Sequence, residues 1–79
     1  MKNIEEILET FSKRLRALMT NADGKKMSNK ELSEKCGLPR TTINGWLSGK
    51  RCPTVYSAYV LAEYFGVSID YLTGRKDFE

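Results

Sequence analysis

The sequence has no histidine and only two cysteines among its 79 residues. Histidine is the commonest metal ligand and general base, and two cysteines alone complete neither a zinc site nor a disulfide framework. Paired catalytic carboxylates and a glycine-rich phosphate loop are missing as well, so we expect no metal, no cofactor and no enzymatic activity. Cys36 stands at an apolar helical position and is interpreted as a buried structural thiol, whereas Cys52 lies in a basic loop.

Long apolar runs are also missing. No stretch approaches the roughly 18 to 20 residues that cross a bilayer, and the first residues have neither the basic end nor the apolar block of a signal peptide. We therefore expect a cytoplasmic protein without a membrane partner. A chain this short has room for one core, which predicts a single domain over residues 1–79. Within it, we expect residues 1–10 to extend the first helix and residues 75–79 to form a frayed tail. A further domain or protein partner stays open.

Positive charge is concentrated in the middle of the chain. Residues 25–51 carry seven basic and two acidic side chains, residues 1–24 carry four of each, and residues 52–79 carry two and four. A segment of net charge +5 thus stands between flanks of 0 and −2. This pattern is typical of a face that meets a polyanion, although solvated surface charge can produce similar asymmetry.

The spacing of apolar residues predicts five helices and no strand. The first helix, over about residues 3–20, has one apolar face: Ile4, Ile7, Leu8, Phe11, Leu15 and Leu18. The fourth begins after Thr54 and ends at Gly66, and its apolar face is also continuous: Val55, Ala58, Leu61, Ala62 and Phe65. Ser68 caps a short fifth helix, Ile69 to Thr73, which ends at Gly74.

A tight turn separates the second and third helices. Ser28 as an N-cap, with Glu31 three positions later, predicts a helix from about Asn29 to Cys36. Gly37 ends that helix, and only two residues precede the next apolar-periodic segment, which ends by Gly49. Two short helices joined in this way form a helix-turn-helix motif. The predicted fold class is therefore all-α, a compact five-helix domain.

The third helix, which starts near Arg40, has side chains suited to reading DNA. A helix presented by such a turn fits the major groove, where its first turns reach base edges. Arg40 can pair with guanine, Thr41 can bond a base or place its methyl against thymine, and Asn44 can pair with adenine. Gly45 is unfavourable in a helix interior by about 1 kcal/mol relative to alanine. Either DNA approaches closely at Gly45, or the neighbouring helices tolerate the defect.

Polar residues on both sides of this helix are predicted to contact the sugar-phosphate backbone. Asn29, at the start of the second helix, can contact a phosphate and brace Arg40. The other members of the patch are individually as consistent with simple solvation, but together they are predicted to hold phosphates: Lys26, Lys30, Ser48, Lys50 and Arg51.

As a whole, the sequence resembles the lambda-repressor-like family of DNA-binding domains, which includes phage repressors, Cro proteins and Xre-type regulators. Four stretches carry the resemblance: FSKRLRALM (11–19), MSNKELSEKCG (27–37), LPRTTINGWLSGKRCP (38–53) and LAEYFGVSIDYLTG (61–74). The resemblance implies a five-helix domain acting as a homodimer on a pseudo-palindromic operator in double-stranded DNA. It also implies that five residues face DNA: Asn29, Arg40, Thr41, Asn44 and Gly45. Many relatives have glutamine where Asn29 stands and glutamate where Leu47 stands.

Dimerisation and a rival function concern the last two helices. In relatives the partner surface often comes from the short last helix, which here offers Ile69 and Tyr71. Four side chains of the fourth helix cannot all fit inside so small a core: Tyr56, Tyr59, Val60 and Tyr64. They are either surface residues or a face for another protein. Our main hypothesis is a sequence-specific transcriptional regulator, a repressor; the rival is a protein-interaction module, such as an antitoxin or adaptor, on the same fold.

Overall fold

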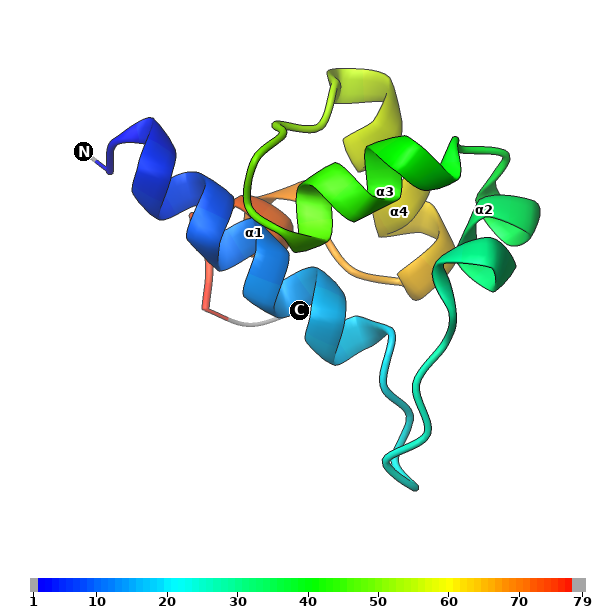
Figure 1. Ribbon diagram of the computed structural model, residues 1–79. Coiled ribbons are helices and arrows are strands. Elements are labelled where there is room, and N and C mark those ends of the chain that lie inside the picture. The colour runs from blue at the N-terminus through cyan, green and yellow to red at the C-terminus, as the bar shows by residue number, and fades with distance from the viewer. Residues whose placement is uncertain (1, 78–79) are drawn as a thin grey trace.

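The computed structural model describes residues 2–77 and contains five α-helices. They are α1 (Ile4–Leu18), α2 (Asn29–Cys36), α3 (Arg40–Leu47), α4 (Val55–Phe65) and α5 (Ile69–Thr73). Figure 1 shows α2 and α3 joined by a short turn, with α1 beside α3. The all-α, five-helix prediction is confirmed. The predicted frayed tail stays a prediction, and its residues 78–79 lie outside the described part of the chain.

Short polar side chains begin four of the five helices. The side-chain oxygens of the N-cap residues accept hydrogen bonds from backbone N–H groups in the first turn, as they do at Asn3, Ser28, Thr54 and Ser68. α3 begins after Pro39, which makes no side-chain cap. The first N–H groups of α3 therefore have no side-chain partner at the helix start.

Each helix contributes to one core. The seven largest fully buried side chains come from all five helices: Phe11, Leu15, Leu32, Ile43, Trp46, Leu61 and Leu72. The rings of Phe11 and Trp46 meet edge to face, with centroids 5.9 Å apart, and so join α1 to α3. Because Ile43 and Trp46 are buried, the opposite face of α3 is turned to solvent.

Two apolar residues predicted to pack inward are exposed instead. Ile4 is 56% exposed and Val55 is 85% exposed. Both stand at the first position of a helix, and Figure 1 shows the first turn of α1 extending beyond the other helices. Helical spacing identifies the face on which a side chain lies, but only the packed helices decide how far along that face the core extends.

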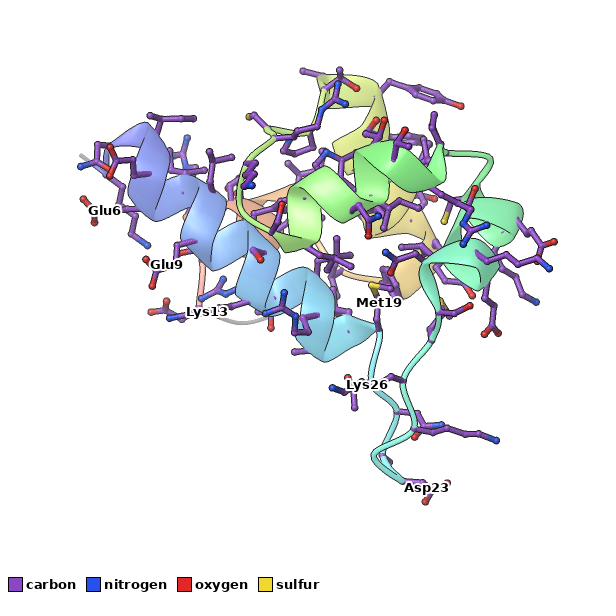
Figure 2. The ribbon with its side chains drawn as sticks, in the orientation of Figure 1. Glu6, Glu9, Lys13, Met19, Asp23 and Lys26 are labelled. Atoms are coloured by element: carbon purple, nitrogen blue, oxygen red, sulfur yellow. The ribbon has the colours of Figure 1, made fainter. Side chains whose placement is uncertain are left out.

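α1 ends at Leu18, two residues before the predicted end at residue 20. Met27 N–H donates to the Met19 carbonyl at 2.7 Å, and Thr20 forms an antiparallel bridge with Lys26. These pairings turn the segment between α1 and α2 into a small hairpin that points away from the helices, with Asp23 near its tip (Figure 2). Long-range backbone pairing therefore ends α1 earlier than the local pattern indicates.

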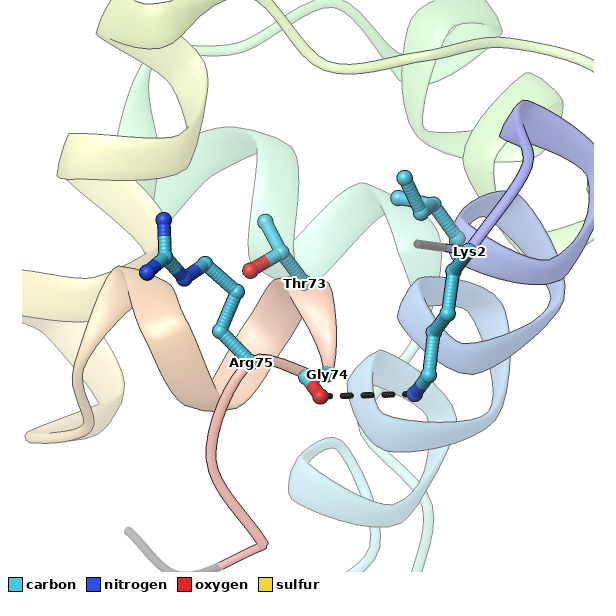
Figure 3. A pocket seen from close by; sticks show the side chains of 5 residues that line it. Lys2, Thr73, Gly74 and Arg75 are labelled. Atoms are coloured by element: carbon cyan, nitrogen blue, oxygen red, sulfur yellow. Dashed lines mark hydrogen bonds between the residues drawn. The ribbon is translucent and has the colours of Figure 1, made fainter.

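Two basic side chains, Arg14 of α1 and Lys2 before that helix, hold the end of α5 and the residues after it. Arg14 Nη1 donates to the carbonyls of Tyr71 at 2.5 Å and Lys76 at 2.6 Å, and its guanidinium stacks 4.4 Å from the Tyr71 ring centroid. Lys2 Nζ donates to the Gly74 carbonyl at 3.3 Å, as Figure 3 shows. Cations at these carbonyls complement the partial negative charge at the end of α5.

Candidate nucleic-acid interface

The three predicted base-reading residues lie together on the exposed face of α3. Arg40, Thr41 and Asn44 are all exposed, whereas Ile43 and Trp46 on the opposite face are buried. Steps of three and four residues return to the same side of a helix, so Arg40, Thr41 and Asn44 share one side. The arrangement presents a guanidinium, a hydroxyl and an amide to the same ligand.

Asn29 of α2 is bonded to this face. Its Nδ2 donates to Oδ1 of Asn44, so the bracing contact goes to Asn44 in place of the Arg40 that we expected. An amide oxygen has two lone pairs, and the Nδ2 group of Asn44 keeps both of its donors. Asn44 can therefore still offer a donor and an acceptor to an adenine edge while Asn29 holds its orientation.

The predicted phosphate-contacting residues lie before or at the start of α2 and directly after α3. Lys26, Lys30, Lys50 and Arg51 are exposed. Lys26 and Asn29 line one shallow hollow together with Arg16 and Leu47 near the end of α3, so the tertiary structure brings residues from three segments to one place: Arg16, Met19, Thr20, Lys26, Met27, Asn29 and Leu47. Long cationic side chains in such positions suit contact with a polyanion.

Ser48 already makes a hydrogen bond within the chain. Its hydroxyl donates to the Gly45 carbonyl at 3.1 Å. A hydroxyl has one donor, so Ser48 must rotate before it can donate to a phosphate. It also lines a hollow beside the acidic side chains Glu5 and Glu9 of α1.

Gly45 is explained by a contact that sequence reasoning missed. A Cβ atom at position 45 would lie 2.5 Å from Cγ and 3.1 Å from Cβ of Arg51. Real Cβ atoms essentially never come within 3.0 Å of another heavy atom. Nothing local in the sequence signals this contact, because the two residues meet only when the chain turns back after α3.

The end of α3 is held by α1 through one backbone carbonyl. The Leu47 carbonyl accepts a hydrogen bond from Ser12 Oγ at 2.7 Å and another from Arg16 Nη2 at 2.5 Å. The sequence alone indicates no role for Arg16, because a charged residue on the polar face of a helix is usually only solvated.

Two groups have shifted pKa values, and both lie outside the exposed face of α3. Burial raises the pKa of the Cys36 thiol, which packs against the core, because desolvation disfavours the thiolate. Lys13 lowers the pKa of Glu9 through a 2.9 Å hydrogen bond and its positive charge. Figure 2 shows this exposed pair on α1. Cys52 is exposed, and both cysteines are free thiols.

The two residues predicted for a dimer surface differ in their surroundings. Ile69 is 37% exposed and lines an apolar groove that also contains Val55. Tyr71 is half-buried, with its ring against Arg14 of α1. Three tyrosines of α4 are exposed, at 68% for Tyr56, 55% for Tyr59 and 40% for Tyr64, whereas Val60 packs against the core.

Within residues 2–77, no group of three or more cysteine, aspartate or glutamate side chains is placed to hold a metal ion. None of the helices described above is long and apolar enough to cross a membrane.

Comparison with known proteins places this arrangement in a family. Residues 13–72, from α1 to α5, match the helix-turn-helix family. The chain belongs to this family. The helix-turn-helix protein therefore has α2 and α3 as its motif, and the resemblance to lambda-repressor-like domains is confirmed.

One curated relative of this helix-turn-helix protein is similar across most of the chain. It is the HTH-type transcriptional activator BcrR of Enterococcus faecalis, 36% identical over 67 residues. The match covers 85% of this chain and 31% of the relative, so the chain spans about a third of the length of that protein. No solved structure matches the chain.

Proposed function

We propose that this chain binds double-stranded DNA in a sequence-specific manner as the DNA-binding domain of a transcriptional regulator. One observation carries the proposal: α3 exposes Arg40, Thr41 and Asn44 on one face while its other face is anchored in the core. The surrounding segment 25–51 has a net charge of +5. A helix suits the major groove when the core holds it rigidly, its exposed side chains are polar and the surrounding segment is positively charged.

In this proposal the residues have two kinds of role. Arg40 pairs with guanine, Thr41 contacts a neighbouring base, and Asn44, held by Asn29, pairs with adenine. The backbone-contacting residues give affinity and salt dependence without sequence information. They are the residues predicted from the sequence: Lys26, Asn29, Lys30, Ser48, Lys50 and Arg51.

We further propose that two copies bind a pseudo-palindromic operator. A single small module contacts too little DNA for tight specific binding, whereas two modules about 34 Å apart double the readout. The exposed apolar groove at Ile69 and Val55 supports a contact between copies at α5 and the start of α4. Tyr71 is the weaker member of the predicted pair, because its ring already packs on Arg14.

A protein-interaction module remains the second candidate, and one observation favours it. The exposed tyrosines are amphipathic side chains and stand on α4, a different helix from the one that carries the proposed base-reading residues. An antitoxin or adaptor would use this surface in place of α3. The two candidates differ in which helix tolerates substitution without loss of binding.

Selection of bound sequences from random duplex DNA, at a stated salt concentration, tests the proposal. We expect enrichment of a symmetric motif whose half-sites are about one helical turn apart. Absence of any enriched motif would contradict DNA reading and favour the interaction module. Sedimentation on duplexes with altered half-site spacing then tests the dimer, and binding that ignores the spacing would exclude cooperation between copies.

The direction of regulation is a separate proposal. Our sequence hypothesis is repression, whereas the relative BcrR is named a transcriptional activator. Either effect needs the same operator contact and depends on where the operator lies relative to the promoter. A reporter gene under the selected operator, with and without the chain, measures the direction.

A further inference from the structure

The turn after α3 brings Arg51 back against the helix. Lys50 N–H donates to the Gly45 carbonyl at 2.9 Å and Gly49 N–H donates to the Trp46 carbonyl at 3.1 Å. Together with the positive φ of 75° at Gly49, these bonds form a Schellman motif. Arg51 N–H also donates to the Gly45 carbonyl, at 3.1 Å. The backbone of Arg51 is therefore fixed beside Gly45.

The aliphatic stem of Arg51 occupies the space where a side chain at position 45 would lie. All three heavy atoms nearest to a Cβ built on Gly45 belong to this stem, with Cγ at 2.5 Å and Cβ at 3.1 Å. Cβ and Cγ are close to the backbone, which the Schellman motif holds. Any larger residue at position 45 therefore displaces the side chain of Arg51.

Gly45 lies on the face of α3 that carries the predicted readers. Positions 41, 44, 45 and 48 lie on one side of a helix because they are separated by steps of three and four residues. Thr41, Asn44 and Ser48 are exposed, and so is Arg51. The stem of Arg51 thus extends the reading face across a position that has no side chain of its own.

We infer that Gly45 is a positioning residue that acts on DNA only through Arg51. This inference rests on the proposed DNA-binding function and replaces close approach of DNA at Gly45. A long side chain loses conformational freedom when it binds, and a stem already held against the helix loses less. Gly45 therefore increases affinity by ordering the cation of Arg51 before DNA arrives.

A double-mutant cycle tests the coupling. Gly45→Ala, Arg51→Ala and the double variant bind a mixed-sequence duplex of about 20 base pairs at several salt concentrations. We expect Arg51→Ala to lower the slope of log affinity against log salt by about one. Gly45→Ala should weaken binding and lower this slope in the wild-type background, and change neither quantity when Arg51 is already alanine.

Lys50→Ala is the matched control, since it removes an adjacent exposed cation and leaves the stem of Arg51 in place. In that background Gly45→Ala should keep its full effect on affinity and slope. An equal effect of Gly45→Ala with and without Arg51 would overturn the inference, because Gly45 would then act on DNA directly. Wild-type binding by Gly45→Ala would also overturn it.

Thermal unfolding of each variant distinguishes a loss of DNA binding from a loss of folding. Arg51→Ala removes Cγ and Cδ, the two atoms nearest to a Cβ at position 45, and leaves only the Arg51 Cβ at 3.1 Å, so the double variant should fold and melt above Gly45→Ala. Unfolding of Gly45→Ala together with folding of the double variant would support the steric coupling, whereas unfolding of both would contradict it. Failure of the wild-type chain to bind any duplex would contradict the proposed function, and this result is seen before the cycle begins.

Discussion

At the scale of single residues, Arg40 and Lys50 are exposed cations with different expected roles. Arg40 starts α3 and Lys50 follows the helix, so we expect Arg40 to bond a base and Lys50 to contact the backbone of the DNA. The distinction between them is therefore one of position and not of charge.

Substitution separates these two roles. Arg40→Ala should lose about 1 to 3 kcal/mol on the selected operator and relax specificity at one base position, because a bidentate pair is lost. Lys50→Ala should weaken matched and mismatched sites alike and lower the salt slope by about one. Titration of both variants on matched and mismatched duplexes measures the difference. The same uniform loss in both variants would show that Arg40 does not read a base.

The two cysteines allow a test of burial at the residue scale. Burial raises the pKa of the Cys36 thiol, so at any pH in the thiol range Cys36 has a smaller thiolate fraction than an ordinary cysteine. We expect iodoacetamide to modify the exposed Cys52 first, and Cys36 to react appreciably only as the pH rises above the usual thiol range. Peptide mass spectrometry measures both rates, and the urea-unfolded chain serves as the control. Equal rates in the folded chain would contradict the prediction.

At the scale of the helices, α1 positions α3 through its end as well as through the core. The Leu47 carbonyl, at the end of α3, accepts from Ser12 Oγ and Arg16 Nη2 on α1. Ser12 is 7% exposed, so its hydroxyl has little access to water. The hydrogen bond from Ser12 therefore contributes to the stability of the α1–α3 contact.

Ser12→Ala tests this contact between elements. We expect a loss of about 1 kcal/mol in the free energy of unfolding, since the hydrogen bond from Ser12 disappears while Arg16 still donates to the Leu47 carbonyl. Urea denaturation measures the loss. Ser48→Ala is the control: its hydroxyl is exposed, and its change should stay within about 0.5 kcal/mol. Equal stability of Ser12→Ala and the wild type would mean that the core alone positions α3.

At the scale of the whole molecule, Arg14 closes the fold by holding α5 and the following residues against α1. It bonds the carbonyls of Tyr71 and Lys76, and Nη2 lies 3.6 Å from the Asp77 carboxylate. The ion pair with the exposed Asp77 carboxylate contributes little to stability. The hydrogen bonds to the two carbonyls connect segments that are far apart in the sequence. The end of the described chain is thus attached to the first helix.

Arg14→Ala should release this attachment. The N–H groups of Arg75 and Lys76 donate to the Asp70 carbonyl, and we expect their hydrogen exchange to accelerate by about tenfold or more when Arg14 is removed. Exchange at Leu15 and Ile43 in the core provides the internal reference. Unchanged exchange at residues 75 and 76 would show that α5 retains this segment without Arg14.

The sequence by itself determined where most of the helices begin and end. Helix caps act within one helical turn, as they do at Ser28, Thr54 and Gly37. Their effect can therefore be predicted without the rest of the chain. The exposed face of α3 was predictable for the same reason, since apolar and polar positions alternate with the helical period.

Only the tertiary structure decided the contacts between segments. The partner of Asn29, the exposure of Val55, the early end of α1 and the contact of Gly45 with Arg51 all depend on residues brought together by packing or by a reversal of the chain. No local sequence pattern predicts such contacts between segments. The mid-helix glycine left two explanations open, close approach of DNA or a tolerated defect, and only the folded chain revealed the stem of Arg51 beside it.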